Sequence, residues 1–128
     1  MSPATGLRLL VVEDHLDTAE LLADLLARRG HRVVIAGCAS DALRLASEET
    51  FDVVVSDVGL PDATGYDLMK ELRARCPIKG IAMSGYGRAE DLEKSREAGF
   101  EEHLTKPIML QKLEQAIARI HSGATPTG

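Results

Sequence analysis

The sequence has few aromatic residues, few cysteines and no long hydrophobic run. Tryptophan is absent, and the four aromatic residues are Phe51, Tyr66, Tyr86 and Phe100. Any core must therefore consist mainly of Leu, Val, Ile and Ala. No apolar run approaches the roughly 20 residues that cross a membrane as a helix, so we expect no membrane segment in this chain. The first six residues lack the basic and apolar regions of a secretory signal peptide.

Cysteine usage and charge exclude further classes of protein. Cys38 and Cys76 lie far apart and form no Cys-x-x-Cys pair, which disfavours a disulfide framework or a zinc site. This usage favours a reduced, cytoplasmic setting. The formal net charge of −5 and the pI near 5.3 argue against direct binding of nucleic acid. A length of 128 residues suits one domain.

Short apolar runs alternate with amphipathic stretches along the chain. Runs rich in Val, Ile and Leu without polar alternation are typical of strands buried on both faces of a parallel sheet. The five predicted strands are Leu7–Val12, Arg32–Ala36, Asp52–Ser56, Lys79–Met83 and Glu102–Thr105. The five predicted helices are Leu16 to a C-terminal cap at Gly30, Ser40–Glu48, Tyr66–Ala74, Ala89–Ala98 and Met109–Ile120. The pattern predicts an α/β fold, a doubly wound five-stranded parallel sheet in a three-layer sandwich.

One domain over residues 7–121 accounts for this pattern. The ends, residues 1–6 and 122–128, are rich in Ser, Thr, Pro, Gly and Ala, as flexible ends or linker remnants are.

Polar side chains follow the predicted strands. Glu13 and Asp14 follow the first strand, Asp57 the third, Ser84 the fourth and Lys106 the fifth. Ligands of open parallel sheets bind at the carboxyl ends of the strands, so these groups converge on one edge. Each has an ordinary structural explanation alone, such as an N-cap for Asp14, a turn for Asp57 or Ser84, and solvation for Lys106. Together they indicate a site, because clustered acids need a counter-ion.

Phosphoryl transfer to a carboxylate uses this set of side chains. Oxygen ligands from Glu13, Asp14 and Asp57 suit Mg²⁺, a hard cation that prefers oxygen donors. Asp57 would be the nucleophile, while Lys106 and Ser84 would contact phosphoryl oxygens.

Four motifs, in this order and spacing, identify a family. They are LRLLVVEDH (Leu7–His15), SDVGLPDATGYDL (Ser56–Leu68), AMSGYG (Ala82–Gly87) and HLTKP (His103–Pro107). Between about Leu7 and Ile120 the chain resembles the receiver domain of two-component response regulators, which has a flavodoxin-like fold. The SGYG and HLTKP segments are also similar to the C-terminal receivers of hybrid histidine kinases.

The resemblance implies a role for each matching position. Glu13 and Asp14 correspond to the metal-binding acidic pair, Asp57 to the phosphorylated aspartate, and the backbone carbonyl of Gly59 to a further Mg²⁺ ligand. Ser84 corresponds to the switch hydroxyl.

Lys106 corresponds to the lysine of the family pattern, and the Lys106–Pro107 peptide bond is expected to be cis. Phosphate would come from a histidine kinase or a histidine-phosphotransfer protein, with Mg²⁺-dependent autophosphorylation and autodephosphorylation. The chain would act as a monomer or weak dimer, and its partner face would include Ala89–Ala98 and His103–Gln115.

One position departs from the family pattern, and two others bear on the hydrolysis of the phosphoryl group. His103 stands where the family usually has the Tyr or Phe of the switch. It either alters that switch or is a polar residue on the exposed face of an edge strand, and the second alternative carries more weight. Gly59 and Tyr86 flank the expected path of a hydrolytic water; we expect Gly59 to open that path and Tyr86 to cover part of it.

Three other functions are less consistent with these residues. A phosphatase with an aspartate nucleophile usually has a second acid two residues later, where this chain has Gly59. A nucleotide-binding flavodoxin-like module would need glycines rather than Glu13–His15 at the first turn. A degenerate receiver that binds partners without phosphorylation remains the alternative, although the complete acid set disfavours it.

Overall fold

A computed structural model describes residues 6–85 and 87–122 of the chain. All five strands belong to one parallel sheet in the order β2-β1-β3-β4-β5. Their bounds are β1 Arg8–Val12, β2 Arg32–Ala36, β3 Val53–Asp57, β4 Lys79–Ser84 and β5 Glu102–Thr105. The predicted fold class is confirmed. Of the predicted flexible ends, residues 1–6 and 122–128, Ser122 is instead the last residue of a helix, and residues 1–5 and 123–128 lie outside the described residues.

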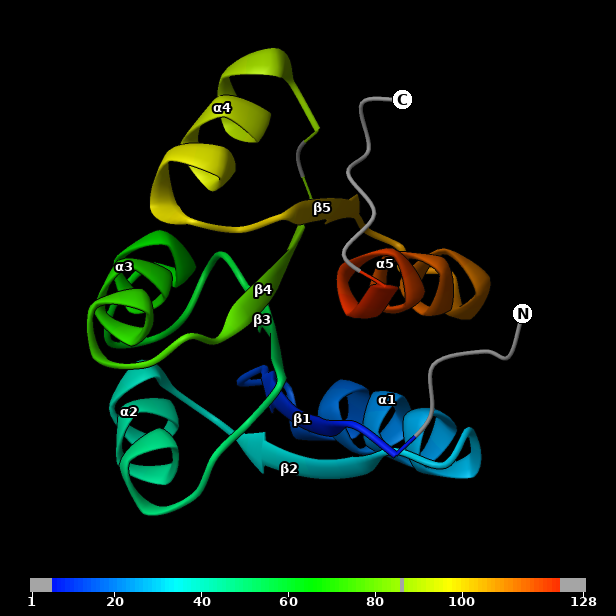
Figure 1. The fold of residues 1–128 in the computed structure, drawn as a ribbon. Coiled ribbons are helices and arrows are strands. Elements are labelled where there is room, and N and C mark those ends of the chain that lie inside the picture. Colours follow the sequence, from blue (N-terminus) through cyan, green and yellow to red (C-terminus); the bar gives the residue numbers. More distant parts are fainter. Residues whose placement is uncertain (1–5, 86, 123–128) are drawn as a thin grey trace.

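Five helices cover the two faces of the sheet. Their bounds are α1 Leu16–Arg28, α2 Ala39–Glu48, α3 Gly65–Arg75, α4 Ala89–Ala98 and α5 Leu110–Ser122. Figure 1 shows α1 and α5 on one face, with α2, α3 and α4 on the other. None of the helices described is both long enough and apolar enough to cross a membrane.

The side chains of each central strand belong to two apolar clusters, one on each side of the sheet. In β1, Leu9 and Val11 pack toward α1 and α5, while Leu10 and Val12 pack toward α2 and α3. Successive side chains of a strand point to opposite faces, so a strand covered on both sides needs apolar residues at every position. β3 meets this requirement with Val53, Val54 and Val55, and it ends in two buried polar residues, Ser56 and Asp57.

The predicted bounds of β2, β5 and α4 equal the observed ones, and those of the other elements differ by one or two residues. β3 includes Asp57 and β4 includes Ser84, so both polar residues are the last members of buried strands. Gly30, as predicted, closes α1 and Gly99 closes α4, with φ of 91° and 108° that a side-chain-bearing residue rarely adopts.

The N-cap role considered for Asp14 is wrong. His15 is the N-cap residue of α1, and its side chain makes no capping hydrogen bond. The His15 N–H instead donates to Glu13 Oε1 at 3.0 Å, while the Asp14 side chain is exposed. Asp14 is therefore available for another role at the edge of the sheet.

Candidate functional site

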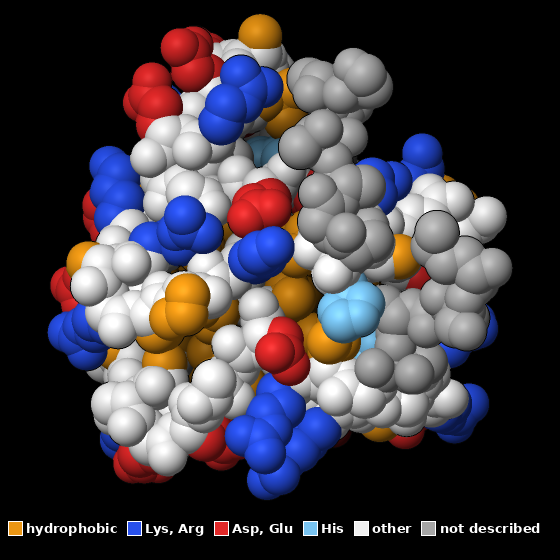
Figure 2. Space-filling model, in the orientation of Figure 1, with side chains coloured by type: hydrophobic (Ala, Val, Ile, Leu, Met, Phe, Trp, Pro, Cys, Tyr) orange, Lys and Arg blue, Asp and Glu red, His pale blue; other side chains and the backbone are white. Residues whose placement is uncertain are grey.

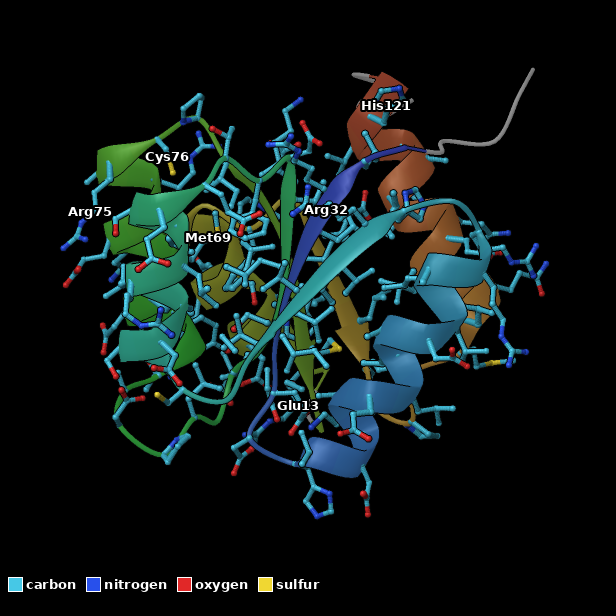
Figure 3. All side chains as sticks on the ribbon, turned by 90° about the horizontal axis from the view of Figure 1, so that it is seen from below. Glu13, Arg32, Met69, Arg75, Cys76 and His121 are labelled. Atoms are coloured by element: carbon cyan, nitrogen blue, oxygen red, sulfur yellow. The ribbon has the colours of Figure 1, made fainter. Side chains whose placement is uncertain are left out.

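Three carboxylates gather at the carboxyl edge of the sheet. Glu13 and Asp14 directly follow β1, and Asp57 ends β3, the neighbouring strand. One oxygen from each lies within 4.8 Å of the others. Figure 3 places Glu13 at the opposite end of the sheet from Arg32 and His121. The predicted convergence of these acids is present in the structure.

Glu13 occupies an unfavourable position for a charged group. It is 3% exposed, and burial, together with the negative charge of Asp57, raises the pKa of its carboxyl despite the His15 N–H bond that opposes this. Among the residues described, none donates a hydrogen bond to the buried Glu13 Oε2 atom. A buried carboxylate oxygen with no donor needs a cation beside it.

Lys106 supplies one positive charge to this cluster. Its Nζ donates to Asp57 Oδ2 at 2.8 Å and lies 3.6 Å from Glu13 Oε2. Burial alone would lower the pKa of the lysine, but the hydrogen bond with Asp57 and the charges of both acids raise it. Lys106 is therefore not the solvated lysine of the simpler interpretation. The Lys106–Pro107 peptide bond is cis, as predicted.

The residues present fit a hard divalent cation. Three carboxylates lie together, the Lys106 ammonium is beside those of Glu13 and Asp57, and no described residue donates to Glu13 Oε2. Carboxylate oxygens are the ligands that Mg²⁺ prefers. The Gly59 N–H donates to Asp57 Oδ1 at 3.2 Å, and coordination by its carbonyl stays a prediction.

The loop after Asp57 is held by backbone contacts to the sheet and to α3. The Val58 N–H donates to the Met83 carbonyl at 2.9 Å, and the Gly65 N–H donates to the Val58 carbonyl at 2.7 Å. A Cβ atom at Gly65 would collide with the carbonyl oxygen of Asp57. Only glycine permits this approach, so Gly65 helps set the position of the acidic strand end.

Asp62 is a residue of this loop that the sequence interpretation missed. Its two carboxylate oxygens accept from the Ala39 and Ser40 N–H groups at 2.8 and 3.0 Å, and these bonds lower the pKa of Asp62. The loop thus caps the N-terminus of α2, a position that favours an acid. Asp62 is 23 residues away from Ala39, so no local pattern connects the two. The only indication of this cap in the sequence is that α2 begins without a capping side chain of its own.

The interpretation of His103 as a polar residue on an exposed strand face is wrong. The side chain is half-buried, and its Nδ1 lies 2.6 Å from Ser95 Oγ of α4. Its Nε2 lies 3.3 Å from Ser84 Oγ at the end of β4. The exposed-edge view failed because α4 covers this side of β5.

Of the two residues expected beside a hydrolytic water, Gly59 is among the described residues. Gly59 is exposed, and a Cβ atom placed there would meet no atom of the described residues within 4 Å. The expectation for Tyr86 lies outside the described residues.

This parallel α/β domain has an acidic cluster and a lysine at the carboxyl edge of its sheet. Comparison of the chain with known protein families agrees with that arrangement. The family model of the response regulator receiver domain matches residues 9–118. The chain therefore belongs to the receiver domains of two-component systems.

Curated relatives include sensor proteins much longer than this chain. The virulence sensor protein BvgS of Bordetella pertussis is 35% identical over 139 aligned positions, which cover 98% of this chain and 11% of that protein. The sensor histidine kinase RcsC of Escherichia coli is 32% identical over 120 positions, covering 91% of this chain and 12% of the relative. The chain thus spans about a tenth of the length of these relatives.

Solved receiver domains share the fold. The non-phosphorylated HemR receiver domain of Leptospira biflexa is 29% identical with a TM-score of 0.80, and the match covers 90% of this chain and 94% of that one. A receiver domain protein from Clostridium thermocellum is 26% identical with a TM-score of 0.82, covering 92% and 94% of the two chains.

Proposed function

We propose that the chain is a phosphoacceptor of a two-component phosphorelay, with Asp57 as the acceptor. The observation that carries this proposal is the Asp57 carboxylate, which is 8% exposed, lies among two further acids and is paired with Lys106 at 2.8 Å. Membership in the receiver family supports the same role.

The reaction transfers a phosphoryl group between two nucleophiles. A carboxylate oxygen of Asp57 forms the new P–O bond as the P–N bond of a donor phosphohistidine breaks, and the departing imidazole takes up a proton. The Lys106 ammonium balances charge on the phosphoryl oxygens. The hydroxyl of Ser84, 5% exposed at the end of β4, donates a hydrogen bond to one of these oxygens. Water reverses the modification when it attacks the phosphorus.

Glu13, Asp14, Asp57 and the Gly59 carbonyl would hold Mg²⁺. When bound, the cation offsets the clustered carboxylate charge and the charge of the incoming phosphoryl group. The donorless Glu13 Oε2 atom and the raised pKa of Glu13 support this assignment, because a cation would stabilise the ionised form.

The donor would be a histidine kinase or a histidine-phosphotransfer protein that docks beside the acidic cluster. A depression there is lined by apolar residues of α1 and of the segment after Lys106, including Leu21, Leu22, Pro107 and Ile108. Leu21 is 60% exposed, and an exposed apolar side chain beside a reactive group suits a protein partner. The relatives' names support a place within a sensor histidine kinase.

Phosphorylation would then bias α4, β5 and α5 toward a second arrangement. Ser84 ends β4, the strand between β3 and β5, so a hydroxyl drawn toward Asp57 changes its contacts with β5.

Replacing the acceptor tests the proposal directly. Incubation with Mg²⁺ and acetyl phosphate should add one phosphoryl group to the wild-type chain by intact-mass spectrometry, and Asp57→Asn should add none. Asp24→Asn, a matched change at an exposed acid of α1, should label like the wild type. Full labelling of Asp57→Asn would contradict the assignment of Asp57 as the acceptor, whereas a wild-type chain that takes up no phosphoryl group would favour the degenerate-receiver alternative.

A side chain at Gly59 tests the path of the hydrolytic water. A Cβ atom at Gly59 meets no described atom within 4 Å, and we expect Gly59→Asn to lengthen the phosphoryl lifetime by roughly tenfold, about 1.4 kcal/mol in the barrier. Gly37→Asn, where a Cβ atom also meets nothing within 4 Å, is the control. Equal lifetimes in the two variants would remove Gly59 from the path.

A further inference from the structure

A histidine links the candidate site to α4 through both of its ring nitrogens. His103 lies in β5, opposite Ala82 of β4. Its Nε2 lies 3.3 Å from Ser84 Oγ, and its Nδ1 lies 2.6 Å from Ser95 Oγ. Ser84 is 5% exposed and Ser95 only 2%. The two hydroxyls are therefore shielded, and the imidazole connects them.

The number of protons on these groups limits how they can bond. A neutral imidazole carries one N–H, so one nitrogen donates and the other accepts. A serine hydroxyl has a single proton to donate, although it can accept other bonds. The Ser84 proton can therefore go to His103 Nε2 or to a phosphoryl oxygen, but a full hydrogen bond to both at once is excluded.

We propose that Ser84, His103 and Ser95 form a hydrogen-bond relay whose direction reverses on phosphorylation. The inference rests on the proposed function, because Ser84 turns its proton to the phosphoryl group on Asp57. The contact between Ser84 and His103 then persists only with the proton on Nε2, which donates to Ser84 Oγ. Nδ1 becomes an acceptor, and the Ser95 hydroxyl donates to it.

Each state of the relay contains the same number of protons. Before phosphorylation, Ser84 donates to Nε2, and Nδ1–H donates to Ser95. Afterwards the imidazole proton has left Nδ1, another has joined Nε2 by exchange with water, and the net change on the ring is zero. His103 is thus a positioning residue that transmits the state of Ser84 to a buried hydroxyl of α4 without leaving its place.

Nitrogen NMR of the full chain tests the relay because it distinguishes protonated from bare ring nitrogens. The probe is Mg²⁺ with beryllofluoride, a stand-in for the phosphoryl group. We expect loading to raise the ratio of the Nε2–H to the Nδ1–H tautomer of His103 by about 2- to 10-fold, the factor that one neutral hydrogen bond supplies. A loaded chain with Nδ1–H, with both nitrogens protonated, or with an unchanged ratio overturns the relay.

Ser95→Ala tests the far end of the relay. It removes the Nδ1 partner from a buried helical site without adding volume, and the loaded tautomer ratio should fall by about 2- to 10-fold. Ser95→Thr keeps a hydroxyl and should restore the ratio. Ser47→Ala, at an exposed helical serine of α2, should change nothing. An alanine variant with the wild-type ratio, or a threonine variant that matches alanine, overturns the relay.

The same spectra separate failure of the relay from failure of the proposed function. If beryllofluoride leaves the Asp57 and Lys106 resonances of the wild type unchanged, the phosphoacceptor assignment fails and the relay falls with it. If those resonances shift while the His103 tautomer does not respond, the acceptor site stands and only the relay is wrong.

Discussion

The two ends of the sheet differ in the residues that they bury, although the same strands form both. At the carboxyl end the strands stop at buried or clustered charges, with Glu13 3% and Asp57 8% exposed. At the amino end the strands begin at exposed or half-buried charged residues such as Arg8, Arg32 and Lys79. Beneath these residues, the buried apolar side chains of Leu7, Phe51, Ile78 and Ile120 line a depression. Figure 2 looks onto this second end, where hydrophobic side chains are visible at the centre and charged ones are scattered around them.

The difference shows where stability and function reside in the molecule. The amino end removes apolar surface from water, which stabilises the fold. The carboxyl end brings like charges together, and within the described part of the chain it gives the Glu13 Oε2 atom no donor, which costs stability. Local rules are broken at the end where a cation and a phosphoryl group would bind.

Truncation of a buried aromatic at the amino end should have the largest effect on stability. Phe51 is 6% exposed in the cluster under α2, α3 and α4, so Phe51→Ala should lower the free energy of unfolding by about 3–5 kcal/mol. Urea denaturation monitored by circular dichroism measures it. The remaining folded molecules should still accept one phosphoryl group on Asp57.

Truncation of an exposed apolar residue at the carboxyl end provides the comparison for the loss of stability in Phe51→Ala. Leu21→Ala removes an aliphatic side chain that is 60% exposed beside the acidic cluster, so its unfolding free energy should stay within about 0.5 kcal/mol of the wild type. Equal losses in Phe51→Ala and Leu21→Ala would contradict the proposed division between the two ends.

Magnesium should stabilise the chain through the carboxyl end alone. At a free concentration about 100 times the dissociation constant, one site adds about 2.7 kcal/mol to the free energy of unfolding. Glu13→Gln should lose most of this increment, because the amide removes one negative ligand from the cluster. Phe51→Ala should retain it. Urea titrations with and without MgCl₂ measure this increment in the free energy of unfolding. An unchanged increment in Glu13→Gln would exclude Glu13 as a ligand.

The sequence predicts the acidic end better than the connections that hold it. Strand ends and polar residues follow short-range patterns, so Glu13, Asp57 and Lys106 could be placed at one edge without coordinates. The capping of α2 by Asp62 and the contact of His103 with Ser95 depend on how α2 and α4 pack. Such contacts leave no periodic signal, which is why His103 was assigned to an exposed face.

The amino end also contains a buried titratable group, and its pH dependence gives the smallest predicted effect. His31 is 7% exposed, and its Nδ1 accepts a hydrogen bond from the Leu7 N–H at 3.4 Å. Burial lowers the pKa of His31 although the charge of Glu114 opposes this. The folded chain therefore favours the neutral imidazole.

The sign of the effect follows from proton linkage. The unfolded chain binds a proton near the ordinary histidine pKa of about 6.5, before the folded chain does. The stability contributed by His31 is thus fully present above that pKa and is lost as the pH falls through the lower folded pKa. The slope from this one group is at most about 1.4 kcal/mol per pH unit.

His31→Asn isolates this contribution because asparagine keeps an acceptor near the Leu7 N–H but does not titrate in this range. Urea denaturation between about pH 7.5 and 5, without Mg²⁺, should show a shallower fall in unfolding free energy than in the wild type. His15→Asn, at an exposed histidine of the carboxyl end, should keep the wild-type slope even if the new N-cap shifts the absolute value. If His15→Asn flattened the slope and His31→Asn did not, the acid sensitivity would belong to the charged end rather than to the buried apolar end.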